Sequence, residues 1–275
     1  MANAGDLQAV TAVKNSFVNV VADARGFIEL AGLPILATAI LSVFFGSIVT
    51  AVVEPDASAD GDPVAGMFQM LAVLGSVLAL ALSLMFMVAW YRRYLSTGPA
   101  ESGWKALRWD RIRTRFLFRM LMIAGILLLT IVMGLTFLES ILGAIGLPPA
   151  AVLLVCLLLA LAINGRLILI LPATAVDNTL TLRESWNLTQ GLTGRMMMVL
   201  LLPVAPVLIV ILGVTSIIGQ ENVEGYLTGK ETVSSTLTGS FLFALARETL
   251  AYAWYAIQVG AIADAYRQIK ARAQV

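Results

Sequence analysis

Few residues in this sequence have side chains that could carry out chemistry. The 275 residues include no histidine and a single cysteine, Cys156, which excludes histidine-based relays, most zinc sites and a disulfide within the chain. The groups that could supply acid–base chemistry on the outer side of a membrane are Glu139, Glu248, Tyr252 and Tyr255, and they form no known catalytic arrangement. The sequence therefore predicts a protein that is not an enzyme, with no catalytic residue, cofactor or metal site.

A pair of charges interrupts the last apolar segment of the chain. Arg247 and Glu248 would be costly inside a membrane unless they were paired or hydrated, so one interpretation is a functional polar site there. The favoured interpretation is a helix that begins before Ser240, which places the pair at the outer interface with Glu139 as the expected partner of Arg247. The residues of this possible site are Glu139, Arg247, Glu248, Tyr252, Tyr255 and Gln258.

Basic residues gather between the second and third apolar segments. Such a cluster attracts anionic lipid by about 1 kcal/mol per basic residue near a charged surface, although the same residues would also orient the chain in the membrane. Trp104 and Trp109 lie among them and favour contact with a membrane over contact with nucleic acid. The candidates for contact with anionic phospholipid are Arg92, Arg93, Arg108, Arg111, Arg113 and Arg115.

A third polar region surrounds the end of the fourth apolar segment. Thr181 and Glu184 have the spacing of a capping box that begins a helix, and Gly191 is suited to end that helix. Arg166 has two interpretations. It contacts an anion or a lipid headgroup, or it forms a structural bridge to Asp177 or Glu184, which is the interpretation we favour.

The composition indicates the elements that must position these residues. Hydrophobic residues make up 59% of the chain, charged residues make up 13%, and the mean hydropathy is +0.90. A soluble domain carries about 25% charged residues, so the sequence is typical of an all-α integral membrane protein. Six apolar stretches reach the length of about 20 residues that a membrane-spanning helix needs. They are residues 27–53, 64–91, 120–138, 149–171, 196–218 and 240–263.

The distribution of basic residues predicts the orientation of these spans. The acidic loop at 54–63 and the loop at 139–148 contain no lysine or arginine, and the loop at 219–239 contains one, Lys230. The alternate segments are basic, which predicts six spans with both termini in the cytoplasm. Because the first residues lack a basic region followed by an apolar run, we expect no cleaved signal peptide.

The spans are predicted to form a single membrane domain of three units, near residues 1–95, 96–175 and 176–275. Each unit would consist of an interfacial helix followed by a membrane hairpin. In the first unit, Leu7, Val10, Val13, Phe17, Val20, Val21 and Ala24 share one helical face. This helix either packs on the cytoplasmic face of the bundle or lies in the headgroup layer. Pro34 and Pro203 occupy similar places in the first and fifth spans, where each would kink its helix.

Two passages resemble a known group of proteins. Arg166-Leu-Ile-Leu-Ile-Leu-Pro172 and Leu182-Arg-Glu-Ser-Trp-Asn-Leu-Thr-Gln-Gly191 are similar to a stretch of bacterial polytopic membrane proteins. This group includes the membrane domain found beside glycerophosphoryl diester phosphodiesterases. Ala89-Trp-Tyr-Arg-Arg-Tyr-Leu95 looks like the end of the second span in alphaproteobacterial members, which have a histidine at the position of Tyr91. The resemblance implies an architecture but no reaction, with a structural motif of Arg166, Pro172, Thr181, Glu184, Trp186 and Gly191.

Three classes of function are compatible with these features. The sequence favours a non-catalytic protein that accompanies or organises a membrane assembly and contacts the bilayer and its anionic phospholipid. Its further partner would be another membrane protein or a second copy of the chain, and we expect no nucleic acid. The alternative is a small-molecule or lipid transporter, favoured by the repeated hairpins and the polar sixth span. An enzyme is the least favoured class, because no recognisable catalytic arrangement is present.

Overall fold

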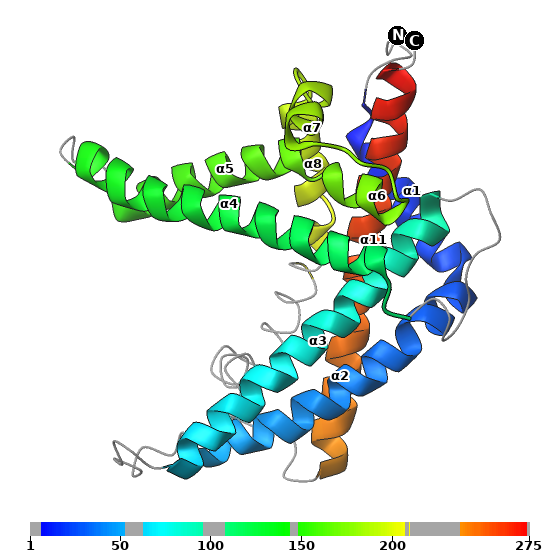
Figure 1. The fold of residues 1–275 in the computed structure, drawn as a ribbon, viewed down its shortest axis with the longest axis vertical. Helices are drawn as coiled ribbons and strands as arrows, with labels where there is room; N and C mark the ends of the chain where they lie inside the picture. The colour runs from blue at the N-terminus through cyan, green and yellow to red at the C-terminus, as the bar shows by residue number, and fades with distance from the viewer. Residues whose placement is uncertain are drawn as a thin grey trace.

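The structure, a computed structural model, describes residues 7–52, 63–95, 108–143, 148–206, 209 and 237–273. Within these ranges all regular secondary structure is helical, which confirms the predicted all-α class. The helices form two arms that diverge from a common junction (Figure 1). Most of the side chains discussed below lie in the junction and at the ends of the helices that meet there, whereas Arg247 and Glu248 contact Ser42 farther along the first arm.

The first arm consists of α2 (Ala24–Val52), α3 (Pro63–Leu95) and α11 (Leu237–Ala273), which pack side by side. Aromatic rings fill the space between them. Phe86 of α3 packs edge-on against Phe27 of α2 and Tyr252 of α11, with ring centroids 6.0 and 5.2 Å away. Pro34 lies inside α2, and the Thr38 hydroxyl donates to its carbonyl at 2.7 Å. Rigid ring contacts therefore hold these three helices together.

The second arm is a hairpin of α4 (Arg111–Gly143) and α5 (Pro149–Leu167), and the short helix α6 (Ile170–Ala175) follows α5 at the junction. The outer part of the hairpin extends away from the first arm (Figure 1). Of the most apolar stretch of α4, 6% is buried, whereas 39% of the corresponding stretch through α5 and α6 is buried. Few residues of α4 are therefore fully buried, and one of its sides is left uncovered by the described part of the chain.

Helix α1 (Ala9–Ala22) lies antiparallel along the C-terminal half of α11. The backbone N–H of Gln8 donates to the Gln268 side chain at 2.9 Å, and the Ser16 hydroxyl donates to the Ile257 carbonyl at 2.9 Å. This helix therefore packs on the chain itself, the first of the two predicted alternatives. The predicted packing face is partly wrong, because Val10 and Val21 are exposed. The buried residues of α1 are Val13, which belongs to the predicted face, and three small residues: Ala9, Ala12 and Ser16.

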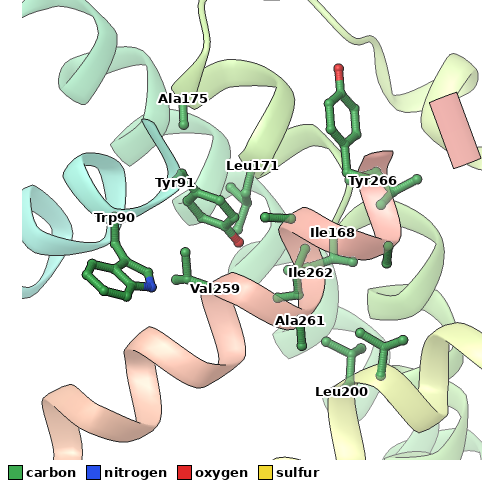
Figure 2. Packing of buried hydrophobic residues seen from close by; sticks show 14 of the residues in the cluster. Trp90, Tyr91, Ile168, Leu171, Ala175, Leu200, Val259, Ala261, Ile262 and Tyr266 are labelled. Carbon is green, nitrogen blue, oxygen red and sulfur yellow. The ribbon is translucent and has the colours of Figure 1, made fainter. Parts of the chain in front are cut away.

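The hydrophobic core lies where the ends of the two arms meet. Figure 2 shows Tyr91 of α3, Leu171 of α6 and Ile262 of α11 converging there, and all three are buried. Helices α7 (Leu182–Leu188) and α8 (Thr193–Leu201) complete the junction, and α8 packs against α5. The two helices approach closely at Gly165 of α5. A Cβ added to this glycine would lie 3.2 Å from the Cβ of Met196 of α8.

Within the described ranges, four helical segments are long and apolar enough to cross a membrane: Ala24–Phe44, Met70–Leu95, Arg111–Phe137 and Ala150–Ala175. They correspond to the first four predicted spans. The fifth predicted span, 196–218, overlaps the second of two helices, Leu182–Leu188 and Thr193–Pro206, which meet at an angle of 100°. Together these two helices could form at most one further span. Most of the rest of that prediction lies outside the described residues. The membrane character is therefore clear, whereas six spans, three units and the position of the termini remain predictions.

Two predicted elements differ in part from the structure. The last helix begins at Leu237, before Ser240, as the favoured interpretation of Arg247 and Glu248 expected, but it ends at Ala273 rather than at 263 and is more polar than the four apolar segments. The second interfacial helix was expected among the arginines before the third span. In the structure α4 begins at Arg111 and runs without a break into that span, because no glycine or proline lies between Arg111 and Met120. The part of this prediction at 96–107 lies outside the described residues.

Candidate functional site

An aspartate just before α4 joins two of the predicted lipid-binding arginines. Arg92 at the end of α3 donates to the Asp110 carboxylate at 3.1 Å and to the Ala175 carbonyl of α6 at 3.1 Å. The guanidinium of Arg113, which is 1% exposed, pairs with the same carboxylate at 3.0 Å. Partial burial acts to raise the pKa of Asp110, but the backbone N–H of Arg113 and the charges of both arginines outweigh this effect and lower it. Asp110 therefore fixes α3, α4 and α6 at the junction.

Two further arginines of this cluster are also paired within the chain. Arg93 forms a two-pronged ion pair with Asp23, the residue between α1 and α2, in which one N–O distance is 2.7 Å. Hydrogen bonding from Arg93 is the largest influence on the pKa of Asp23, and it lowers that pKa below its usual value. Arg115 pairs with Asp177 at 2.9 Å. Asp177 has a positive φ of 56°, a conformation that aspartate tolerates better than most residues.

The predicted lipid contacts thus divide into two sets. Arg92, Arg93, Arg113 and Arg115 hold helix ends together. Arg108 and Arg111 are exposed at the start of α4, and neither faces a carboxylate among the described residues. The sequence could not separate the sets, because the three aspartates that neutralise the paired arginines are brought to them by the fold. Contact with lipid remains a prediction for Arg108 and Arg111.

The predicted polar site on α11 is a compact ion pair. Arg247 pairs with the adjacent Glu248 at 2.7 Å, and both side chains hydrogen-bond to the hydroxyl of Ser42, at 2.8 and 3.2 Å. Ser42 is about 27 Å along α2 from Ala24, nearly the full thickness of about 30 Å for the hydrocarbon core. This spacing, and the 55% exposure of the Arg247 side chain, favour the interfacial interpretation. Arg247 has Glu248 and Ser42 as partners. Its predicted pairing with Glu139 stays a prediction, because the Glu139 side chain lies outside the described residues.

The remaining residues of the predicted site form a second, deeper group. Tyr252 is buried, and its hydroxyl lies 3.3 Å from that of Ser83 on α3. Tyr255 packs against the Tyr252 ring at 5.8 Å. Gln258 points to another face, where its side-chain oxygen and the indole nitrogen of Trp254, one turn away, are buried without a hydrogen-bond partner. The structure therefore separates Gln258 from the ion pair with which it was predicted to act.

The motif around Arg166 forms a structural bridge, as favoured, but with different partners. Its guanidinium lies 4.2 Å from the centre of the Trp186 ring and donates to the Thr193 hydroxyl at 3.1 Å. Neither of the expected partners contacts Arg166. Asp177 pairs with Arg115, and Glu184 belongs to the capping box of α7. The capping box is confirmed, since the Thr181 hydroxyl accepts from the Glu184 N–H and the Glu184 carboxylate accepts from the Thr181 N–H.

The other residues of the motif also have structural positions. Gly191 has a positive φ of 77° in the turn after α7, which agrees with its predicted place at the end of that helix. Pro172 is buried in α6. The Ser185 hydroxyl donates to the Arg166 carbonyl at 2.6 Å and thereby fastens α7 to the end of α5. Residues 166–191 thus attach α7 to the second arm.

A pocket between the ends of α1, α3 and α11 has no counterpart among the sequence predictions. It has a volume of about 330 Å³ and is lined by Asn19, Ala22, Asp23, Trp90, Arg93, Tyr94 and Arg267. The Asn19 amide donates to the Tyr94 hydroxyl, and the Arg267 guanidinium lies 5.2 Å from the centre of the Tyr94 ring. The available signal was the basic C-terminal segment, but nothing in the sequence indicates that it meets the residues at 19–23.

Comparison with known proteins identifies no relative: no protein-family model, curated protein or solved structure matches the chain. The resemblance based on residues 89–95, 166–172 and 182–191 therefore remains an expectation. In the part of the chain that the structure describes, no group of three acidic, histidine or cysteine side chains could hold a metal ion. Function must be inferred from the ion pairs, the exposed α4 surface and the pocket.

Proposed function

We propose that the chain is a non-catalytic, multi-pass protein of a bacterial inner membrane that organises or accompanies a membrane assembly and contacts anionic phospholipid. The uncovered surface of α4 is the observation that carries this proposal. Phe118, Leu121, Leu128 and Val132 recur along one side of α4 and are 48–67% exposed. A large apolar surface that the described residues leave uncovered is available to lipid or to another membrane protein.

The ion pairs support a structural rather than a catalytic role. Arg92, Arg93 and Arg113 are bonded to aspartates that connect helix ends, and Arg247 is bonded to Glu248. A paired charge at a helix junction mainly fixes geometry, whereas a general acid or base must also reach a substrate. These contacts give the junction a defined shape from which the α4–α5 hairpin can extend.

Contact with anionic lipid is proposed for the start of α4. Arg108 and Arg111 are exposed there beside Trp109, which is 43% exposed and donates its indole N–H to Thr114. Tryptophan and arginine are favoured at the level of lipid headgroups, where the ring lies in the interface and the guanidinium reaches phosphate. The basic segments, and with them both chain termini, are proposed to face the cytoplasm.

Gentle purification from the native membrane, followed by mass spectrometry of the proteins and lipids that are retained, tests the proposal. A stoichiometric partner should accompany the wild-type protein. Leu128→Trp combined with Val132→Trp should release it, because the two indoles enlarge the α4 surface. The matched control, Leu154→Trp with Leu158→Trp, changes exposed leucines on α5 and should retain the partner. A protein that purifies alone, or a partner lost equally from both pairs, would contradict the proposed role.

The proposed orientation has a separate test. In a Cys156→Ala background, a cysteine introduced at Ser58 in the acidic loop should react with a membrane-impermeant thiol reagent in intact spheroplasts. A cysteine at Lys270 should react only after the cells are opened, because it is expected on the cytoplasmic side. The reverse pattern would exclude the proposed topology.

Transport is the second candidate, favoured by a broken helix and buried polar atoms. Helices α7 and α8 meet at a sharp bend, and Asn164, Trp254 and Gln258 each bury a polar atom that has no hydrogen-bond partner. Transporters place such groups beside broken helices that line a cavity. In the Cys156→Ala background, a cysteine at Gln258 should react with a water-soluble thiol reagent if such a cavity exists. A cysteine at the buried Val259 is the matched control, and an inert Gln258→Cys variant would argue against transport.

A further inference from the structure

The pocket between α1, α3 and α11 lies at the end of a membrane-spanning segment. Arg93 and Tyr94, which line it, are among the last residues of the apolar segment Met70–Leu95. Trp90 forms another part of the lining, and its indole N–H is already bonded to the Ala256 carbonyl at 3.0 Å. Aromatic rings and guanidinium groups at the end of a span belong to the depth of the lipid headgroups. The pocket is therefore placed where a headgroup could enter it.

The charged groups that line the pocket leave one positive charge uncompensated. Asp23 neutralises Arg93 through their two-pronged ion pair. Arg267 is exposed and faces no carboxylate among the described residues. Asp264, three residues before Arg267 on the same helix, is not part of the lining, but it keeps its own negative charge, because its hydrogen-bond partners Asn15 and Gln268 are neutral. The two arginines and one aspartate of the lining thus sum to +1, which suits a singly charged anion.

The geometry holds Arg267 over the pocket. Its guanidinium lies against the Tyr94 ring, a contact that orients the planar group while leaving its N–H donors free of a carboxylate. Tyr94 is itself positioned by Asn19 and by the close approach of α11, since a Cβ at Gly260 would be 3.3 Å from its ring. An arginine held in this way is prepared to donate two parallel hydrogen bonds to a phosphate.

We propose that this pocket binds the phosphodiester of an anionic phospholipid, with Arg267 as the residue that contacts the phosphate. The inference deepens the anionic-lipid part of the proposed function and rests on it. A volume of about 330 Å³ accommodates a headgroup, and it lies at the lower end of the roughly 300–1,000 Å³ of small-molecule sites. The acyl chains remain in the bilayer. A zwitterionic headgroup brings no net negative charge to match the lining and is bound more weakly.

Native mass spectrometry of the detergent-purified full chain tests the site. The protein is titrated with dioleoyl phosphatidylglycerol, and separately with dioleoyl phosphatidylcholine, and the retained lipid molecules are counted. We expect one phosphatidylglycerol to be retained in preference to phosphatidylcholine. Arg267→Gln should weaken this binding by about tenfold, the effect of losing one charge-assisted contact. Arg272→Gln removes the same charge from an exposed position on α11 outside the pocket and should leave the affinity unchanged.

A second variant separates the pocket from its charge. Ala22 is exposed and lines the pocket, so Ala22→Leu should occupy part of the volume and weaken binding without changing the net charge. Thermal unfolding of each variant verifies that it is folded. Equal losses for Arg267→Gln and Arg272→Gln, or full binding by Ala22→Leu, would overturn the proposal, as would equal retention of the two lipids.

Competition with sn-glycerol 3-phosphate identifies the source of the phosphate. If this soluble phosphate ester displaces phosphatidylglycerol, the pocket is a phosphate site, but the assignment of a lipid as its occupant is overturned. If it does not displace the lipid, the acyl chains contribute to binding and the lipid assignment is supported. A wild-type protein that binds no phosphatidylglycerol but still purifies with a stoichiometric partner would overturn this inference alone.

Discussion

Gly26, at the start of α2, has a close neighbour that makes its replacement informative. A methyl group at this position would lie 2.2 Å from a terminal nitrogen of Arg93, far inside the van der Waals distance. The α2 backbone is fixed by its helix, so the guanidinium must move away. Because that guanidinium pairs with Asp23, Gly26→Ala should break the ion pair without altering either charged residue.

The expected change in the free energy of unfolding is the difference between two effects. Hydrogen bonds to charged groups contribute about 1.5–3 kcal/mol. The side chains of Arg93 and Asp23 are 22% and 40% exposed, so solvent screening reduces this contribution to about 1–2 kcal/mol. Replacing glycine by alanine inside a helix stabilises it by up to about 1 kcal/mol, and by less in the first turn. We therefore expect Gly26→Ala to destabilise the protein by about 0.5–1 kcal/mol.

Thermal unfolding of the purified protein in detergent can measure this effect in a double-mutant cycle. Asp23→Asn should destabilise the protein by itself because it removes the carboxylate. In the Asp23→Asn background, Gly26→Ala should be neutral or slightly stabilising, because no ion pair remains to be broken. A Gly26→Ala protein as stable as the wild type, or one destabilised equally in both backgrounds, would refute the reasoning.

Three other predictions concern acidity, helix contact and the ion pair on α11. Because the pKa of Asp23 and that of Asp110 are lowered below the ordinary 3.8, their contribution to stability is complete above that pH and lost as the pH falls through the lower folded values. The Asp23→Asn variant lacks one of these carboxylates, so the stability that it loses between neutral and acid pH should be smaller than in the wild type. Unfolding at each pH can be followed by tryptophan fluorescence, and an equal loss in both proteins would contradict this. Gly260→Ala should cost about 1–3 kcal/mol by overpacking α1 against α11, whereas Gly125→Ala, with no atom within 4 Å of the added methyl, should be neutral or stabilising by up to about 1 kcal/mol in the same melting assay. Glu248→Gln should reduce thermal stability in detergent by at most about 1 kcal/mol, since the partner arginine is 55% exposed, and loss of a transport activity without loss of stability would instead assign this residue to a transport site.

Features encoded by residues close together in the sequence were predictable. The capping box at Thr181 and Glu184 depends on two side chains three residues apart, and the structure forms it. The first four apolar segments likewise depend on continuous runs of residues, and each is a helix of sufficient length. Local hydrogen bonding and burial in lipid determine these features, so the sequence is sufficient to predict them.

Features that depend on distant residues could not be predicted. The arginines of α3 were interpreted as lipid contacts because nothing in the sequence brings Asp23 or Asp110 to them. The same limit applies to Arg166, whose partner is the Trp186 ring rather than a carboxylate. It also applies to α1, where Ala9, Ala12 and Ser16 are buried while Val10 and Val21 of the predicted face are exposed. Opposite charges and close packing choose among partners that only the folded chain brings together.

The pairing of α1 with α11 has a consequence for biosynthesis. Among the helices described here, α1 leaves the ribosome before the others, whereas α11, which contacts Ser16 of α1, is synthesised last. Until translation reaches α11, most of the inner surface of α1 has no permanent cover and is open to chaperones or proteases. Truncation between α1 and α11 should therefore create a nascent chain that cellular surveillance can recognise by the exposed surface of α1.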